Sequence, residues 1–163
     1  MIVLGVDPGI AITGFGVVEY INSRFKVLDY GCIRTAAGVP LPDRLNILYD
    51  GLGRIVDIYR PNEMAVEELF FNKNVRTALA VGQARGVTLL AARQRGVEIF
   101  EYTPLQVKQA VVGHGRADKV QVQYMVKVLL CLSETPSPDD VADALAVAIC
   151  HSFRGGEGGA LQR

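Results

Sequence analysis

Carboxylate side chains occur at three separated places in the sequence, each inside or next to a predicted strand or helix. They are Asp7, the adjacent Glu67 and Glu68, and Asp140 with Asp143. Carboxylate oxygens are the ligands that Mg²⁺ and Mn²⁺ prefer, and there is no His or Cys cluster nearby to favour zinc. Two such ions about 4 Å apart suit phosphodiester hydrolysis, because one activates a water molecule and the other stabilises the leaving oxygen. The pattern therefore indicates a metal-dependent phosphodiesterase, if the fold brings these acids together.

The three aspartates also have simpler structural interpretations. Asp7 precedes Pro8-Gly9 and could serve only to shape that turn. Asp140 follows Ser137-Pro138, a predicted N-cap and first helical residue, and could serve only the helix N-terminus and its dipole. Asp143 is harder to explain in this way, since it lies among apolar residues one turn further along the same side of the helix. Placed together in a partly buried cleft, such acids repel one another unless a divalent cation lies between them.

The adjacent acids Glu67 and Glu68 cannot both join Asp7. Neighbouring residues of a strand point to opposite faces of the sheet, so only one of the two glutamates can face the aspartates. Both faces of this strand are otherwise apolar, and the alternation alone therefore leaves the choice open.

The elements that must position these acids follow from the hydrophobic periodicity. Residues 2–16 are typical of a strand, a Pro-Gly turn and a second strand, which form a hairpin with Asp7 at its mouth. Three strands in hairpin order, followed by alternating helices and strands, predict an α/β fold with a mixed five-stranded sheet and helices on both faces. Further strands are predicted at about 25–35, 64–68 and 98–102, and helices at about 43–59, 74–95, 104–112, 118–132 and 137–153.

Length and composition limit the class of protein. The chain has 163 residues, which predicts one domain, 1–154, followed by a flexible Gly-rich tail, 155–163. We see no secretion signal and no apolar run of the roughly 18 residues that a membrane helix needs. Three widely spaced cysteines favour a reducing cytoplasm. The net charge of zero argues mildly against a nucleic-acid-binding domain, although the distribution of charge matters more than its sum.

Basic residues lie close to the acids in the sequence. On the cleft they would neutralise DNA phosphates, and elsewhere they would form ordinary solvated helix faces; Lys119 could equally be a first-turn surface lysine. The candidates are Lys73, Arg76, Lys108, Arg116 and Lys119.

Small residues recur every four positions along the predicted helix 74–95, at Ala78, Gly82 and Gly86. A glycine costs a helix roughly 1 kcal/mol relative to alanine, so two of them indicate the close approach of another element. That element could be the sheet or the same helix of a second subunit. A two-fold dimer would carry two copies of any site on the subunit.

Several blocks of the sequence, between residue 1 and about residue 153, resemble the RuvC family of bacterial Holliday-junction resolvases. The resemblance implies a ribonuclease H-like fold, a homodimer, and Mg²⁺-dependent paired nicking of four-way DNA junctions in recombination and repair. It also implies a branch-migration helicase partner of the RuvA/RuvB type. The blocks are LGVDPG with TGFGVV, AVEELF, NKN leading to GQARG, FEY followed by VKQAVVGHGRADKVQVQ, and DDVADALAVAICH.

The resemblance also implies roles for individual residues. The family's metal-binding acids fall on Asp7, Glu67, Asp140 and Asp143, which selects Glu67 over Glu68 and implies two Mg²⁺ ions per subunit, with Mn²⁺ as a substitute.

Residues expected to contact DNA follow from the same comparison. Lys108 and Lys119 match positions near the scissile phosphate, and Phe70 matches an aromatic residue that can stack on bases. Phe71 replaces a more usual aliphatic residue, so the sequence leaves open which ring reaches the junction.

Three other functions are less compatible with the sequence. An ATPase domain of the actin, chaperone and sugar-kinase group needs a second such domain and a second phosphate loop, for which 163 residues leave no room. A binding protein without catalysis is disfavoured because all four acids are present. A ribonuclease H-like nuclease of RNA processing is disfavoured by Phe70 and the Lys108–Gln123 block.

Overall fold

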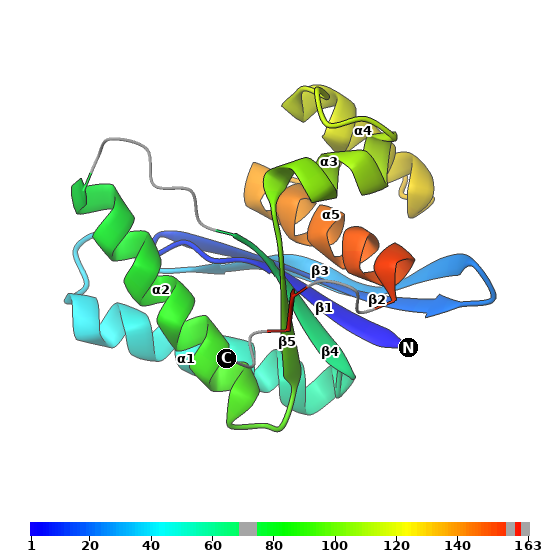
Figure 1. The fold of residues 1–163 in the computed structure, drawn as a ribbon. Helices are drawn as coiled ribbons and strands as arrows, with labels where there is room; N and C mark the ends of the chain where they lie inside the picture. Colours follow the sequence, from blue (N-terminus) through cyan, green and yellow to red (C-terminus); the bar gives the residue numbers. More distant parts are fainter. Residues whose placement is uncertain (69–74, 156–158, 161–163) are drawn as a thin grey trace.

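A central β-sheet forms the middle layer of the protein (Figure 1). The computed structural model describes residues 1–68, 75–155 and 159–160. The strand order is β3-β2-β1-β4-β5-β6, with β1 antiparallel to β2 and parallel to β4, and β4 parallel to β5. The strands are β1 (Ile2–Asp7), β2 (Ile12–Ile21), β3 (Arg24–Arg34), β4 (Glu63–Glu67), β5 (Glu98–Tyr102) and β6 (Gly159–Ala160).

The predicted mixed sheet is confirmed in its five main strands, β1 to β5. The sixth, β6, is two residues long and pairs antiparallel with the edge of β5, in a tail for which we predicted no strand. Backbone pairing with an open sheet edge needs no apolar side chains, which explains why a Gly-rich tail gave no strand signal.

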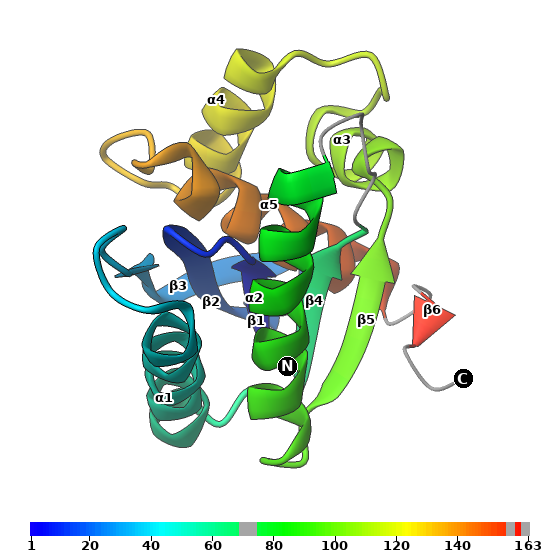
Figure 2. The same cartoon turned by 90° about the vertical axis from the view of Figure 1, so that its left-hand side faces the viewer.

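Helices lie on both faces of the sheet, as predicted (Figure 2). One face is covered by α1 and α2, and the other by α5, with α3 and α4 packed on α5. The bounds differ from the predictions by a few residues; α5, for example, begins after Pro138, which is its N-cap and makes no side-chain hydrogen bond there. The helices are α1 (Leu41–Tyr59), α2 (Val75–Arg93), α3 (Pro104–Val112), α4 (Lys119–Leu129) and α5 (Asp139–Arg154).

Two glycines allow α5 to lie unusually close to β1 and β2. A Cβ atom on Gly5 would be 2.0 Å from the carbonyl oxygen of Ala144, and one on Gly14 would be 2.0 Å from that of Asp140. No side chain fits in such a space, so glycine is required at both positions. The close contact fixes the first turns of α5 against the ends of the two strands.

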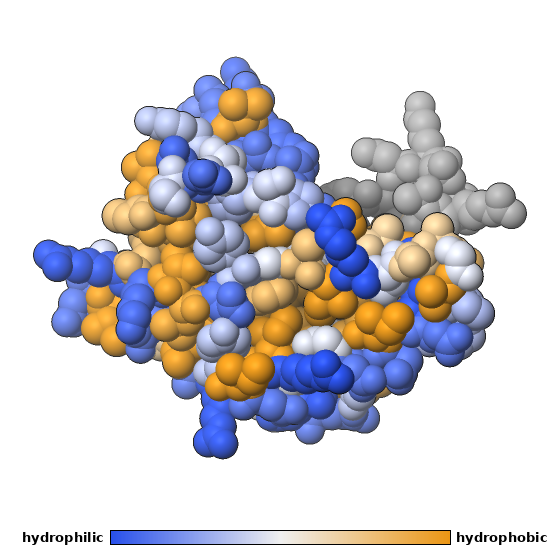
Figure 3. Space-filling view, turned by 180° about the vertical axis from the view of Figure 1, so that it is seen from behind, coloured by the Kyte–Doolittle hydropathy of each residue, from blue (hydrophilic) through white to orange (hydrophobic). Residues whose placement is uncertain are grey.

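The sheet divides the hydrophobic core into two halves. Alternating residues of β1 belong to the two halves of the core, because Val3 packs against α5 while Leu4 packs on the side of α1 and α2. The surface is mixed in character: hydrophobic residues lie among hydrophilic ones on the face seen from behind (Figure 3). The two-sided burial makes the sheet a rigid base for the residues at its strand ends.

Candidate functional site

The carboxyl ends of β1 and β4 bring the first two predicted acids together. These strands are parallel neighbours whose ladder runs as far as Val6 and Val66, so Asp7 and Glu67 each follow the last pair. Asp7 lies two residues after Gly5, which contacts α5, and therefore faces the same helix. Glu67 lies two residues after Ala65, which packs in the core on the α5 side.

The first two turns of α5 supply the other two predicted acids. Gly14, directly opposite Asp7 in the β1–β2 ladder, contacts the backbone of Asp140, so α5 passes close above the end of β1. Asp143 precedes Ala144, whose carbonyl touches Gly5. We call Asp7, Glu67, Asp140 and Asp143 the acidic cluster.

Burial, together with neighbouring carboxylate charges, raises the pKa values of three acids of the cluster. The pKa of Asp7 is raised from 3.8 to about 7, first by burial and then by the charges of Asp143, Asp140 and Glu67. Burial and the charge of Asp143 also raise the pKa of Glu67. The pKa of Asp143 is raised by burial, although Lys119 opposes the shift. The ionised carboxylates of the cluster are thus destabilised both by burial and by their like charges, which a cation between them would offset.

Two lysines share a cavity of about 260 Å³ with part of the acidic cluster. Glu67 and Asp143 line it together with Lys108 from α3 and Lys119 from the start of α4. Both ammonium groups lower the pKa of Glu67 against the stronger effect of burial. Anionic and cationic groups thus face one space, which suits a phosphate bound through both a metal ion and lysines.

Lys119 forms ion pairs with two aspartates of α5. Its Nζ atom lies 3.1 Å from Oδ2 of Asp143 and 3.2 Å from Oδ2 of Asp139. In the part of the chain that the structure describes, no three His, Cys, Asp or Glu side chains converge closely enough to form a ready metal site. The raised pKa values of Asp7, Glu67 and Asp143 nevertheless each include the charge of at least one other acid of the cluster. The Asp143 carboxylate engages the ammonium group of Lys119 instead.

Glu67 and Glu68 point to opposite faces, and it is Glu67 that lies on the side of the acidic cluster. The charge of Glu68 acts instead on Arg85 of α2, on the other face of the sheet. Arg85 is buried, donates a hydrogen bond of 2.7 Å from Nη1 to the backbone carbonyl of Glu67, and pairs with Glu101 of β5. Arg85 was not predicted from the sequence. Its position on α2 beside the buried Ala84 and Thr88 is the signal that could have identified it as a buried arginine.

Some predicted DNA-binding residues lie elsewhere or cannot be placed. Phe70 and Lys73 lie outside the described residues, as does the neighbouring Phe71, and the side chain of Arg76 is not described either. Arg116 is exposed in the turn between α3 and α4 and does not line the cavity that contains Lys108.

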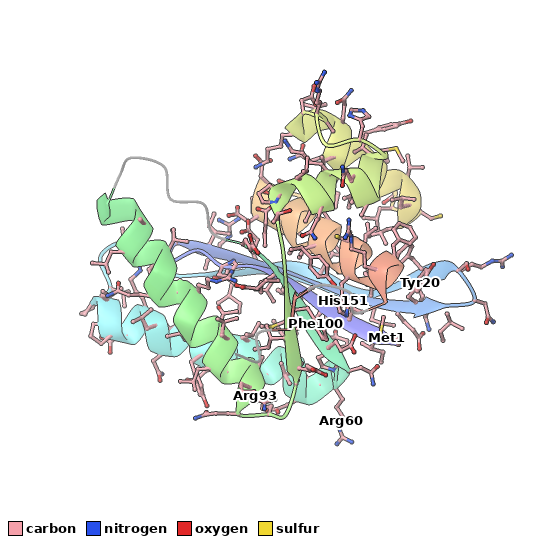
Figure 4. The ribbon with its side chains drawn as sticks, viewed as in Figure 1. Met1, Tyr20, Arg60, Arg93, Phe100 and His151 are labelled. Carbon is pink, nitrogen blue, oxygen red and sulfur yellow. The ribbon has the colours of Figure 1, made fainter. Side chains whose placement is uncertain are left out.

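His151 of α5 lies apart from the acidic cluster. It is fully buried near Phe100, at the middle of the sheet (Figure 4). Its Nδ1 atom is 2.7 Å from the hydroxyl of Tyr102, and its Nε2 atom is 2.5 Å from a carboxylate oxygen of Glu63. With Nε2–H donating to Glu63, Nδ1 accepts the Tyr102 hydroxyl hydrogen, and the buried ring is satisfied at both nitrogens.

Comparisons with known proteins agree on one family. The family model for "Crossover junction endodeoxyribonuclease RuvC" matches residues 3–151. A protein of that name from Pelotomaculum thermopropionicum is 66% identical over 152 residues, 93% of either chain.

Solved structures agree with the sequence matches. The structure of Thermus thermophilus RuvC in complex with a Holliday junction substrate is 39% identical, covers 98% of both chains and gives a TM-score of 0.92. The yeast mitochondrial Holliday junction resolvase shares the fold, with a TM-score of 0.67 at 15% identity, over 92% of this chain and 77% of its own. Within the described residues, no helix has the length and apolar character that a membrane crossing requires.

Proposed function

This chain belongs to the RuvC family of crossover junction endodeoxyribonucleases, and from that premise we propose that its acidic cluster binds the magnesium ions with which it cuts DNA. The family, the ribonuclease H-like fold and the enzymatic activity that the sequence predicted are thereby confirmed. The protein is an endonuclease that resolves four-way (Holliday) junctions. The identities of its metal ions, site residues and protein partners are the subject of the proposal.

The observation that carries the proposal is the excess negative charge at the ends of β1, β4 and α5. Oxygen ligands alone, without His or Cys, fit hard cations such as Mg²⁺ or Mn²⁺. Two such ions per subunit would lower the pKa of a bound water molecule and stabilise the charge on the leaving oxygen. The high pKa of Asp7 also fits, since a cation placed beside it would offset the repulsion that raises it.

The two lysines that line the cavity have a different role from the acids. Lys108 and Lys119 neutralise the scissile phosphate, which could not otherwise approach four carboxylates. Lys119 leaves its ion pair with Asp143 as the site fills, and its ammonium becomes free for a phosphate oxygen. Phe70, Lys73, Arg76 and Arg116 remain proposed contacts to the rest of the junction.

We further propose that the protein acts as a homodimer joined through α2. Gly82 and Gly86 do not pack on the sheet, because a Cβ atom on either would meet none of the described residues within 4 Å. The neighbouring Leu79 and Leu90 are 64% and 50% exposed. An exposed stripe of glycines and leucines suits a second copy of α2, which would place two acidic clusters on one junction. We also propose a cytoplasmic location and a RuvA/RuvB-type helicase partner, for which the family resemblance is the only support.

The test is cleavage of a synthetic four-way junction, compared with linear duplex and RNA–DNA hybrid, in Mg²⁺ and in Ca²⁺. We expect paired nicks in the junction alone, and only in Mg²⁺ or Mn²⁺. Asp7→Asn and Glu67→Gln should abolish cleavage and retain junction binding, while the matched variant Glu68→Gln should cut normally. Loss of binding in the first two variants, or loss of cutting in Glu68→Gln, would contradict the assignment. Cleavage of the hybrid would favour a nuclease of RNA processing.

A further inference from the structure

Arg85 of α2 is a buried cation that the proposed reaction does not use. Its side chain is 9% exposed and lies on the face of the sheet opposite the acidic cluster. Nη1 donates to the carbonyl oxygen of Glu67 at 2.7 Å, while Nη2 pairs with the carboxylate of Glu101. An arginine is rarely buried to this extent unless paired, and one of its partners here is the backbone of a proposed metal ligand.

The carbonyl of Glu67 lies where the regular pairing of β4 ends. The N–H of Glu68 donates toward β5, to the carbonyl of Tyr102, so the carbonyl of the preceding residue points toward β1. On that side the ladder stops at Val6 and Val66. Arg85 supplies the donor that the ladder no longer provides, and it does so with a charged group, which makes the hydrogen bond stronger than a neutral one.

We infer that Arg85 is a positioning residue that fixes the end of β4 and thereby holds the Glu67 carboxylate in the orientation that binds metal. The inference rests on the proposed role of Glu67 in the acidic cluster. Without Arg85, the carbonyl of Glu67 loses its charged donor, and Glu67 samples orientations in which its carboxylate does not face Asp7 and Asp143. The affinity for metal then falls, because metal binding must first return the Glu67 carboxylate to a single orientation.

Four variants, made from three substitutions, separate positioning from simple charge balance. Arg85→Met keeps the apolar stem but removes the hydrogen bond and the charge, so it leaves the Glu101 carboxylate without its cation. Arg85→Met with Glu101→Gln removes that carboxylate as well, and restores the balance without restoring the bond to Glu67. Glu101→Gln alone keeps the hydrogen bond from Arg85 to the Glu67 carbonyl. Arg95→Met is a matched control, because Arg95 pairs with Asp57 far from the acidic cluster.

The measurement is Mn²⁺ binding to the DNA-free protein, by electron paramagnetic resonance or calorimetry, together with the Mg²⁺ dependence of junction cleavage. We expect the double variant to bind Mn²⁺ roughly tenfold or more weakly, as is typical when a group that orients a ligand is lost. Its cleavage rate should recover at high Mg²⁺, and its junction affinity in EDTA should match that of the wild type. Glu101→Gln and Arg95→Met should bind Mn²⁺ normally.

Two outcomes would overturn the inference. One is normal Mn²⁺ affinity in the double variant, and the other is a cleavage defect that persists at every Mg²⁺ concentration without a change in Mn²⁺ affinity. If the double variant does not fold, Arg85→Lys takes its place, because a lysine keeps the charge but cannot bond Glu67 and Glu101 together. Its Mn²⁺ affinity should fall below that of the wild type, and a wild-type value would count against the inference.

Glu67→Gln, measured in parallel, distinguishes this inference from the proposed function. Weak Mn²⁺ binding in Glu67→Gln with normal binding in the Arg85 variants rejects only the positioning role. Normal Mn²⁺ binding and cleavage in Glu67→Gln would reject the role of Glu67 itself, and the inference with it.

Discussion

The ammonium nitrogen of Lys119 lies 3.1 Å from a carboxylate oxygen of Asp143. A proposed phosphate-binding group is therefore paired with a proposed metal ligand. Both have partly exposed side chains, and the pair can open at modest cost. A divalent cation and the ammonium compete for the same carboxylate. Binding of a divalent cation to Asp143 would therefore release Lys119 in the cavity where a phosphate would bind.

Replacing Lys119 by methionine should affect metal binding and cleavage in opposite directions. Mn²⁺ should bind the DNA-free variant more tightly, by several-fold, because Asp143 loses its competing cation and the cluster becomes more negative. Cleavage should fall, since a phosphate-neutralising charge is lost. Calorimetry and a nicking assay at saturating Mg²⁺ measure the two effects, with Lys127→Met on the same helix as the control. Weaker Mn²⁺ binding in Lys119→Met would show that the lysine organises the site rather than competing for it.

The raised pKa of Asp7 predicts how the metal-free protein responds to pH. Because its pKa rises from 3.8 when unfolded to about 7 when folded, ionised Asp7 destabilises the fold. That cost is absent below pH 3.8, grows up to about pH 7, and amounts to at most about 4 kcal/mol above it. Asp7→Asn in EDTA should therefore melt at a higher temperature than the wild type at pH 8, and its advantage should shrink as the pH falls toward 4.

Thermal melts from pH 4 to 8.5 measure this difference, with Glu134→Gln in an exposed loop as the control. Mg²⁺ should raise the melting temperature of the wild type and have little effect on Asp7→Asn. An Asp7→Asn variant no more stable than the wild type at pH 8 would mean that the Asp7 charge is already neutralised without metal.

The sequence predicted the fold well because its signals are local. Hydrophobic periodicity identified β1 to β5 and the five helices, and alternation along a strand showed that Glu67 and Glu68 must face opposite sides. The α5 N-terminus was less well predicted: Ser137 was expected to cap it, yet the cap is Pro138, without a side-chain bond.

Pairings between distant residues could not be predicted in the same way. Glu63 and His151 are 88 positions apart, and Arg85 of α2 reaches the Glu67 carbonyl from 18 positions further along the chain. Periodicity shows which face of an element is buried, but not which polar groups meet there. The choice of Glu67 over Glu68 likewise came from the family resemblance rather than from the residues.

The exposed stripe of α2 predicts the effect of substitutions on assembly. Gly86→Arg should leave the fold intact, because a Cβ atom at this position would meet nothing within 4 Å among the described residues. It should produce a monomer in sedimentation and abolish paired nicking, since two charged side chains would face each other across the two-fold axis. Tyr124→Arg introduces the same charge at an exposed residue of α4 and should leave the mass of the dimer unchanged. A dimeric Gly86→Arg protein would place the interface elsewhere.

The buried contact between Glu63 and His151 predicts a change in stability without a change in chemistry. Glu63→Leu removes the acceptor for Nε2–H and leaves a fully buried polar group unsatisfied, which should lower the free energy of unfolding by about 1–3 kcal/mol. Glu63→Gln keeps an acceptor oxygen and should cost less. Because Glu63 lies at the opposite end of β4 from Glu67, roughly 13 Å along the strand, both variants should cut junctions at the wild-type rate at 25 °C. Urea unfolding and the nicking assay measure the two properties, and a cleavage defect in Glu63→Gln at full stability would link His151 to the acidic cluster.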